Sequence, residues 1–588
     1  NNNQLASGAS TTTATTVGTA SLTASSSVAA SNLNLNTNAL GAYASGNTAS
    51  NELGLAVTQL TQATGAIASF QSASKVSTAS PESLASVDGS VKLTASALTA
   101  VTATVKDNTI KSTALGNVVS NTLALSGSVL TGKASDPDGV TSSATTASAT
   151  SAADFAISNT QLMDALVSSE TVGSVQIATG SLSSSALTLT GNTVKSLAQA
   201  NSAVNYLSLR VTEQKDSTAA VTSSQSSLDN VIASTNPKAS NVFGISASAD
   251  VTNSTVVISG NTASAIAGKN EAFNSLTVTG ANLTGRGNNV TGAVAGTSSV
   301  SGADFVVINA QAALGNTTAT LIPGASGFET TGVLTGGSVS LSGNTVMAAA
   351  NANTAGNTLS LTASSTLSAS GVVNNVQSLA ENASVTASIG VSSGTSGLTV
   401  KTGSDVGGAA VALKDNVVKV SASANTASNV LNAVASNSIA AAGAVTSPGA
   451  GTATPTFAVL NQQTTGAGSS VSSAINQFNM GGSVLNGALS TGGALVMTGN
   501  QFQATAYGNS ATNAVQVSAL SAGLNSASAS ITNVQYNLAS INSTINNINL
   551  QASSSGNTGN SAGAGVNISG NSIVAMAVGN RAVNSTGR

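Results

Sequence analysis

The sequence predicts an all-β protein: a β-solenoid, or a closely related stacked rod of β-repeats, with about four double repeats and no sizeable helix. Three observations carry this prediction. An asparagine motif recurs eight times, small side chains dominate the composition, and apolar and polar residues alternate over long stretches. Repeats at a fixed interval are typical of solenoids, in which each unit buries its apolar face only by stacking on its neighbours.

The motif has the form Asn-x-(apolar)-x-(small)-x-(small)-x-(small)-Asn-x-(Ala/Val)-x-Asn, with a Lys at the last small position of one copy. The units start near residues 38, 108, 192, 261, 344, 416, 500 and 571, where the leading asparagines lie: Asn38, Asn108, Asn192, Asn261, Asn344, Asn416, Asn500 and Asn571. A second asparagine follows nine residues later: Asn47, Asn117, Asn201, Asn270, Asn353, Asn425, Asn509 and Asn580. A third follows after thirteen: Asn51, Asn121, Asn205, Asn274, Asn357, Asn429, Asn513 and Asn584.

Short and long units alternate, because successive leading asparagines are 70, 84, 69, 83, 72, 84 and 71 residues apart. Taken in pairs the period is about 154 residues, the interval from Asn38 to Asn192. Each long unit also carries a mark of its own, Phe-x-x-x-Asn-x-Gln. It occurs three times, as Phe155, Asn159 and Gln161, as Phe305, Asn309 and Gln311, and as Phe457, Asn461 and Gln463.

The chain opens with Asn1-Asn2-Asn3-Gln4, which has the pattern of that mark without its Phe, and the 588 residues fall short of four full periods. We therefore divide the chain into an N-terminal segment, residues 1–31, and a repeat rod, residues 32–588. The segment is expected to act as an inter-subunit strand that completes the last layer of a neighbouring copy. A chain that starts without Met is also consistent with removal of a signal peptide.

The composition predicts a thin interior. Aromatic residues make up 2% of the chain, Trp is absent, and Ala, Ser, Thr, Gly, Asn and Val dominate. A thick globular core needs large side chains to fill it, whereas small ones suit strand faces that meet over a short distance. Disorder is the main alternative for such a biased chain. It is disfavoured by 41% hydrophobic residues, a net charge of −3 and only six prolines.

Within each unit the alternation predicts a strand with one buried face, because side chains at every second position share a face. In the sixth copy the inward set is Val418, Val420, Ala422 and Ala424. At the second asparagine the alternation slips by one residue, which would flip every side chain unless the chain turns a corner there. We expect a Gly-Asn corner with positive φ at this point. The third asparagine then falls on the buried face, either in an amide ladder along the axis or bulging to solvent at a strand end.

Catalytic chemistry is not expected. The chain has no His and no Cys, so imidazole bases, thiol nucleophiles and zinc sites of the usual kind are excluded. We assign no catalytic, cofactor-binding or metal-binding residues and expect no enzyme and no cofactor. The segment Asp136-Pro137-Asp138-Gly139 is interpreted as a turn, because it lacks the further ligands of a calcium loop. With 6% charged residues and no basic cluster or long apolar run, neither nucleic-acid binding nor membrane insertion is expected.

Three stretches, SGNTVMAAANANTAGNTLSL (342–361), TGNQFQATAYGNSATNAVQV (498–517) and SGNSIVAMAVGNRAVN (569–584), resemble secreted bacterial surface proteins of the β-strand-repeat type. The Asn-x-Ala-x-Asn piece is also distantly similar to the Gly-x-x-Asn-x-Ala element of curlin-like fibre subunits. The resemblance implies export across the outer membrane and assembly into a fibre or an adhesive anchor on the cell surface. The units here are much longer than curlin repeats, so amyloid assembly by the curlin route is not implied.

These observations predict a secreted structural protein: a subunit of an extracellular bacterial surface filament that self-assembles head to tail, for adhesion or as biofilm matrix. Its expected partners are other copies of itself, in heterologous contacts that leave the filament open, with a polysaccharide or an abiotic surface as a further candidate. Three alternatives stay open: a monomeric adhesin stalk, a surface-layer lattice protein and an ice-binding solenoid.

Overall fold

The computed structural model describes residues 2–7, 11–74, 82–133, 140–143, 148–287, 291–294, 300–390, 396–441, 443, 445, 455–484, 492–521, 523–554 and 565–587. Within these ranges every regular element is a β-strand and no helix occurs. Strands of successive turns pair in parallel, which confirms the prediction of an all-β solenoid. The chain makes eight such turns, called coils 1 to 8 from the N-terminus. The segment 136–139, interpreted above as a turn, lies outside the described residues.

Each coil passes through four sheets in a fixed order, named sheets I to IV. Sheet I contains β1 (Asn2–Ser7), β6 (Gly65–Ser74), β12 (Phe155–Met163), β16 (Ala219–Ser227), β24 (Phe305–Ala313), β30 (Gly371–Leu379), β37 (Phe457–Thr465) and β43 (Ala529–Asn537). Sheet III contains β3 (Asn32–Asn36), β8 (Thr102–Lys106), β14 (Ala186–Thr190), β20 (Thr255–Ser259), β28 (Ser338–Ser342), β34 (Ala410–Lys414), β40 (Ala494–Thr498) and β46 (Gly565–Ser569).

Sheet II changes along the rod, because its strand is continuous in the first three coils and interrupted in the later ones. The continuous strands are β2 (Thr11–Ala29), β7 (Glu82–Thr99) and β13 (Leu166–Ser183). The later strands are β17 (Val231–Asn236), β18 (Phe243–Ala247), β19 (Val251–Thr252), β25 (Thr317–Leu321), β26 (Ala325–Thr330), β27 (Leu334–Thr335), β31 (Ser384–Ile389), β32 (Ser396–Thr402), β33 (Val406–Gly407), β38 (Ser470–Asn476), β39 (Phe478–Val484), β44 (Ser540–Asn546) and β45 (Asn549–Ser554).

Sheet IV holds the asparagine motifs in its longest strands. It contains β4 (Ala39–Ala56), β5 (Gln59–Thr61), β9 (Thr109–Thr131), β15 (Thr193–Lys215), β21 (Thr262–Thr284), β29 (Thr345–Ser368), β35 (Val417–Ala435), β36 (Ser438–Ala440), β41 (Gln501–Ala519), β42 (Gly523–Asn525) and β47 (Ser572–Gly587). Equivalent asparagines lie side by side, since Asn117 pairs with Asn47 in one neighbouring strand and with Asn201 in the other.

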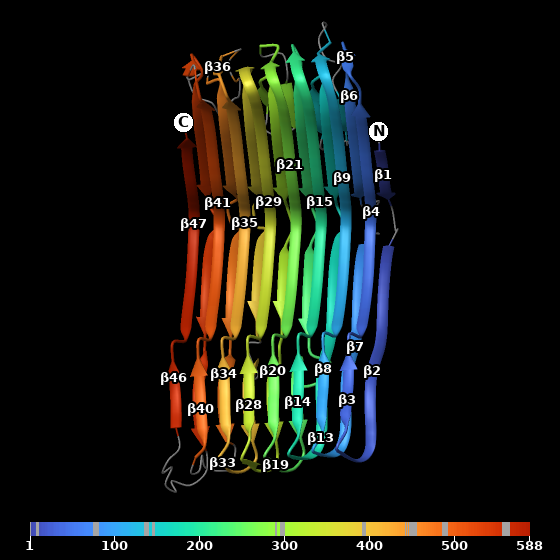
Figure 1. The fold of residues 1–588 in the computed structure, drawn as a ribbon, viewed down its shortest axis with the longest axis vertical. Helices are drawn as coiled ribbons and strands as arrows, with labels where there is room; N and C mark the ends of the chain where they lie inside the picture. The colour runs from blue at the N-terminus through green and yellow to red at the C-terminus, as the bar shows by residue number, and fades with distance from the viewer. Residues whose placement is uncertain are drawn as a thin grey trace.

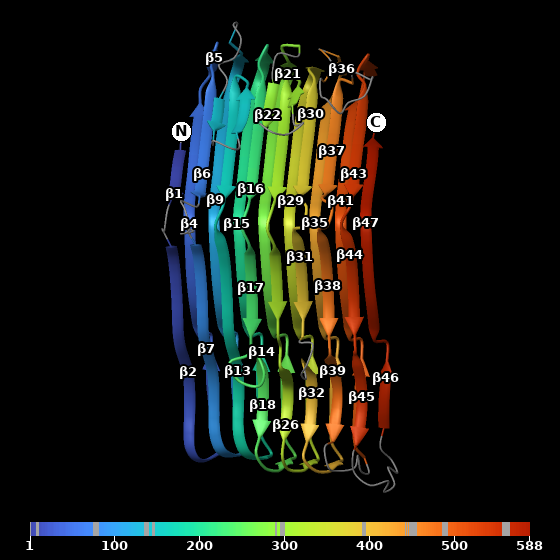
Figure 2. The same ribbon diagram turned by 180° about the vertical axis from the view of Figure 1, so that it is seen from behind.

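The solenoid is flattened into two facing layers. Figure 1 shows sheets III and IV on one broad face, and Figure 2 shows sheets I and II on the opposite face. The strands run along the longest dimension of the molecule, while the coils stack from the N-terminus on one side to the C-terminus on the other (Figure 1). The interior is therefore only as thick as two opposed rows of side chains, which explains why Ala, Val and Ser fill it so well.

Two apolar cores lie between the layers. One, between sheet II and sheets III and IV, includes Leu93, Ile177 and Val420. The other, between sheet I and the far half of sheet IV, includes Phe305 and Leu359. The amide side chains of the second and third asparagines and of the Phe-x-x-x-Asn-x-Gln marks lie between these cores, and those of coils 2 to 7 are buried.

The chain leaves the solenoid after coil 2 and after coil 4, and these excursions lengthen the two long units that contain them. After coil 2 it forms β10 (Val140–Ser143) and β11 (Ser148–Ala152), and after coil 4 it forms β22 (Thr291–Val294) and β23 (Val300–Gly302). These strands pair antiparallel as a four-stranded cover sheet. They lie over the outer face of sheet I, so that all nine residues of β12 are buried.

The predicted Gly-Asn corner at the second asparagine is wrong. Sheet IV strands continue through this position, and the slip appears as one residue left out of the pairing, as at Ala200 between Gln199 and Asn201. The corner lies instead one residue before the leading asparagine, between sheets III and IV. All eight residues at that position have positive φ: Thr37, Asp107, Gly191, Gly260, Gly343, Asp415, Gly499 and Gly570.

Residues 1–31, separated from the rod in the sequence-based division, supply β1 and β2 of coil 1. Both strands pair with the same chain, β1 with β6 and β2 with β7. Their other edges face away from coil 2, as do the free edges of β3 and β4.

Candidate functional site: amide ladders, end faces and an outer groove

The leading asparagines form a continuous ladder of hydrogen bonds along the rod. Each side-chain Nδ2 donates to Oδ1 of the equivalent residue in the next coil at 2.8–3.0 Å. The backbone N–H of each also donates to that same Oδ1, at 2.9–3.1 Å. Because a backbone N–H can bond only an acceptor, this second bond fixes which amide atom faces which neighbour.

The second and third asparagines form two further ladders with the same direction. The Nδ2–Oδ1 distances are 2.8–2.9 Å for the second asparagines and 2.7–2.9 Å for the third. The second asparagines also tie the two layers together, as Asn117 donates to the Leu162 carbonyl of sheet I. The third asparagines are thus placed in a buried ladder rather than bulging to solvent.

A glutamine ladder runs opposite to them in sheet I, and its direction is reversed. Each Nε2 donates to Oε1 of the preceding coil at 2.7–2.8 Å. Backbone carbonyls again fix the amide orientation, since Gln161 Nε2 also donates to the Asn117 carbonyl. The ladder contains Gln4, Gln71, Gln161, Gln225, Gln311, Gln377, Gln463 and Gln535.

Sequence reasoning found this glutamine only in Gln4 and in the three long-unit marks, because it tied the glutamine to the Phe. The signal for the others was a shorter pattern, Asn-x-Gln or Ser-x-Gln, as in Asn375-x-Gln377 and Ser223-x-Gln225. The asparagines of the marks form a partial ladder with the asparagines at the same position in neighbouring coils. Asn309, Asn375, Asn461 and Asn533 bond in succession at 2.7–2.8 Å.

The Phe residues of the marks explain why repeats come in pairs. Phe155, Phe305 and Phe457 point into the core between sheets I and IV and alternate along the axis with Gly65, Ala219, Gly371 and Ala529. A Cβ on Gly65 or Gly371 would lie 3.3 Å from the ring of the adjacent Phe. A Phe in each coil would therefore overfill the thin interior, and one in every second coil fits.

The two end faces of the rod are complementary in their unused amide atoms. On the coil 8 face, Nδ2 of Asn571 and of Asn580 each donate to one backbone carbonyl and keep a second hydrogen. Within the described chain, Nδ2 of Asn584 has no partner, and neither does Oδ1 of Asn38 or Asn47 on the coil 1 face. Asn51 Oδ1 accepts from Asn2 Nδ2 at 3.1 Å and keeps one lone pair. The coil 8 face thus presents asparagine donors, and the coil 1 face presents asparagine acceptors.

The glutamine ladder has the opposite direction, so it presents an acceptor on the coil 8 face and a donor on the coil 1 face. Gln535 Nε2 bonds inward to Gln463, which leaves its Oε1 toward the outer side of coil 8. Gln4 Nε2 donates to the Thr48 carbonyl and keeps one hydrogen on the outer side of coil 1.

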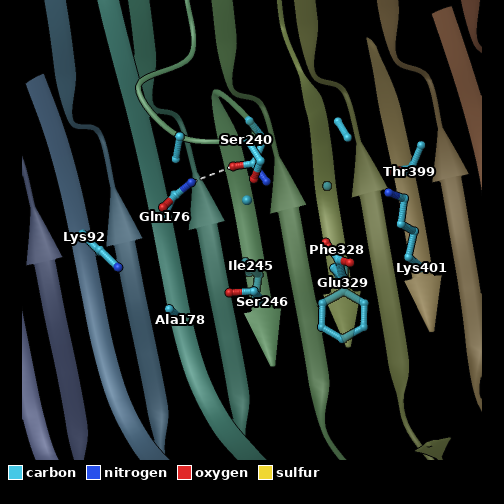
Figure 3. A pocket seen from close by; sticks show the side chains of 15 residues that line it. Lys92, Gln176, Ala178, Ser240, Ile245, Ser246, Phe328, Glu329, Thr399 and Lys401 are labelled. Carbon is cyan, nitrogen blue, oxygen red and sulfur yellow. Dashed lines mark hydrogen bonds between the residues drawn. The ribbon is translucent and has the colours of Figure 1, made fainter. Parts of the chain in front are cut away.

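A groove crosses the outer face of sheet II (Figure 3). It consists of a hollow of about 150 Å³ and an adjoining, shallower hollow of about 560 Å³. Ala178, Ser246 and Glu329 line both hollows, and Lys92 and Lys401 lie at opposite ends of the first. One wall is the chain from 237 to 242, which folds back across coil 3.

Among the described residues, the buried charged side chains are Asp154, Lys269 and Asp304, and Asp154 pairs with Arg286 at 3.1 Å. The Lys269 side chain has no exposed surface, and its Nζ donates to the Leu314 carbonyl. Burial lowers the pKa of Lys269 to about 7, against a smaller opposing effect of Asp229. Asp304 accepts hydrogen bonds from the backbone N–H groups of Gly287 and Ser370, and burial raises its pKa. Both features join neighbouring coils, since Lys269 of coil 4 bonds Leu314 of coil 5 and Asp304 of coil 5 bonds Ser370 at the start of coil 6.

In the part of the chain that the structure describes, no cluster of three or more acidic residues could hold a metal ion. Within the same part, no helical segment has the length and apolar character needed to cross a bilayer. Comparisons with family models, with curated proteins and with solved structures find no match.

Proposed function

We propose that the chain is the structural subunit of an extracellular surface filament, in which coil 8 of one copy stacks on coil 1 of the next. This proposal rests mainly on the direction of the hydrogen bonds in the amide ladders. Three ladders end in donors at coil 8 and in acceptors at coil 1, and the fourth ends the other way round. Head-to-tail stacking continues all four ladders, so that the outward amide atoms of each ladder gain a partner across the joint.

Head-to-head stacking would be unfavourable for the same reason. Two coil 1 faces would oppose asparagine oxygens to asparagine oxygens, and two coil 8 faces would oppose donors to donors. Each buried amide group left without a partner costs about 1–3 kcal/mol. The contact is therefore heterologous, and because it repeats without closing it gives an open filament.

The apolar residues of the two end faces match in register. On coil 8, Val566, Ile568 and Ile573 are 55%, 43% and 50% exposed. Following the strand pairing along sheets III and IV, the equivalent positions in coil 1 are Leu33, Leu35 and Leu40. Stacking would bury these six side chains between two layers as in every internal pair of coils.

Unpaired strand edges of sheets I to IV add backbone hydrogen bonds to the same contact. Edges of this kind recruit further strands unless they are covered. A rod with few charges opposes its own association only weakly, which suits a structural role in adhesion or in a biofilm matrix outside the cell.

A disulfide test can identify the contact, because the chain has no native cysteine. Tyr536 and Leu5 are 59% and 65% exposed and occupy the same outward row of sheet I. Stacked strands lie about 4.8 Å apart, within the Cα separation that a disulfide allows. The double variant Leu5→Cys with Tyr536→Cys should form covalent polymers on oxidation, seen as a ladder on non-reducing gels.

The single variants are the controls. Each alone should stay unlinked, since neither position meets its own copy in a head-to-tail joint. Efficient dimers of a single variant would instead mean symmetric contacts, and a double variant that stays monomeric at concentrations giving filaments in negative-stain micrographs would refute the proposed joint.

A further inference from the structure

The groove on sheet II lies where the repeat is broken. In coil 4 the chain from 237 to 242 turns out of the sheet and crosses coil 3, until Lys238 Nζ reaches Asp88 of coil 2 at 2.9 Å. The backbone N–H groups of Lys238 and Ala239 donate to Ser174 Oγ, which donates to the Asn241 carbonyl. Departures from regular repeats on one face of a solenoid often form binding surfaces.

The floor of the groove is an outward row of sheet II with two glycines in its centre. Lys92, Gln176, Gly244, Gly327 and Thr399 occupy one outward row across coils 2 to 6. The Asn241 side chain lies over Gly244, where an added Cβ would come within 2.6 Å of it, so this part of the floor has room only for a glycine. Gln176 Nε2 donates to Asn241 Oδ1 at 2.8 Å, which fixes the wall beside this opening (Figure 3).

The next outward row supplies the polar lining. Ala178, Ser246, Glu329 and Lys401 follow one another across coils 3 to 6. Ser246 and Glu329 are exposed, and Lys401 is half-buried. Lys92 and Lys401 lie four strand spacings apart, about 19 Å.

We propose that this groove binds a linear, uncharged glycan that lies along the rod axis from Lys92 to Lys401. Each sugar hydroxyl both donates and accepts a hydrogen bond. The lining matches this property, because lysine ammonium groups donate, the Glu329 carboxylate accepts and Ser246 does both. The site lies within one chain, so the inference is independent of the proposed filament.

Other ligand classes fit the lining less well. A nucleic acid or another polyanion is recognised by clustered cations, and the Glu329 carboxylate lies next to Lys401 in this groove. An apolar ligand needs a largely apolar pocket, and here Lys, Gln, Ser and Glu line the hollow. The length of the groove also favours a chain over a single sugar, since only a chain contacts both lysines.

Calorimetric titration of the purified chain with neutral hexasaccharides would test this inference. The probes are cellohexaose, maltohexaose and chitohexaose, with glucose as the short probe and polygalacturonate as the polyanion. We expect saturable binding of at least one hexasaccharide and none of glucose. Ala178→Ile, which narrows the groove, and Glu329→Ala with Lys401→Ala should each weaken that binding at least tenfold.

Lys419→Ala and Glu381→Ala provide matched controls, because both side chains are exposed and lie outside the groove. These variants should bind as the parent chain does, and circular dichroism verifies that every variant is folded. The inference is overturned if no hexasaccharide binds, if the groove variants bind like the controls, or if polygalacturonate alone binds and is released by salt.

Discussion

At the scale of single residues, the asparagine amide joins the coils. An amide carries both donors and an acceptor, so one side chain can bond the coil before it and the coil after it. A hydroxyl can also do both but reaches less far, and the ladder weakens where serine replaces asparagine. Asn159 Nδ2 lies 3.4 Å from Ser223 Oγ, whereas Asn309 Nδ2 lies 2.8 Å from Asn375 Oδ1.

Lys269 is the residue that departs most from its repeat. The equivalent positions hold Gly or Ala: Gly46, Gly116, Ala200, Ala352, Ala424, Gly508 and Gly579. Since burial lowers its pKa from 10.5 to about 7, the folded chain favours the neutral amine. The unfolded chain then binds more protons between these values, so the free energy of unfolding should rise with pH across this window and be lowest below pH 7.

Lys269→Met should remove this pH dependence and raise the free energy of unfolding at pH 7 by on the order of a few kcal/mol. The measurement is denaturant unfolding of both proteins from pH 6.5 to pH 9. Lys419→Met, at an exposed lysine, serves as the control and should leave the pH profile as in the parent. A parent chain with the same pH profile as Lys269→Met would contradict the assignment.

At the scale of elements, the thin interior sets a limit on side-chain volume along each row. In sheet I a Phe in one coil alternates with Gly or Ala in the next, which keeps the total side-chain volume of the row within that limit. This alternation groups the coils into double repeats. Gly371 lies between Phe305 and Phe457, and its position is occupied by Ala219 and Ala529 in other coils.

Gly371→Phe should therefore destabilise the region by about 1–3 kcal/mol through overpacking. Gly371→Ala should change stability by less than about 1 kcal/mol, because other coils accept Ala there and the atom that its Cβ would approach to 3.0 Å is the end of the Leu359 side chain. Amide hydrogen exchange in β30 and β37, followed by mass spectrometry, measures the effect locally. Phe457→Gly introduced together with Gly371→Phe should recover part of the loss, and no recovery would mean that the row is not limited by volume.

Local patterns made the strands and the third-asparagine ladder predictable, because alternation and fixed spacing follow directly from strand geometry. The corner was misplaced since Thr37, Asp107 and Asp415 stand where five other copies have Gly, which hides the positive-φ position. The cover sheet and the groove were not predictable. They depend on which coils the excursions cross, as when Lys238 reaches Asp88 over coil 3, and no local pattern encodes that contact.

At the scale of the whole molecule, the ladders give the rod a direction. All described asparagine ladders point their donors toward coil 8, so the two ends differ chemically although the coils between them are alike. Growth by stacking should accordingly join unlike ends only. An end that loses its donors should stop accepting the next copy while the rod itself remains folded.

Asn584→Asp tests this directly. Its Oδ1 accepts from Asn513 within the same chain, a role that a carboxylate retains, and its outward Nδ2 would be replaced by an oxygen facing Asn51 of the next copy. Because one hydrogen bond contributes about 1 kcal/mol and like partial charges repel, the concentration needed for filaments should rise about tenfold or more. Asn432→Asp, a half-buried mid-rod position, should leave this concentration unchanged.

Below about pH 4 the new carboxyl becomes protonated and regains a donor, so pelleting assays should show assembly of Asn584→Asp recovering relative to the parent chain at the same pH. Equal assembly of both proteins at neutral pH would show that ladder direction does not govern the joint.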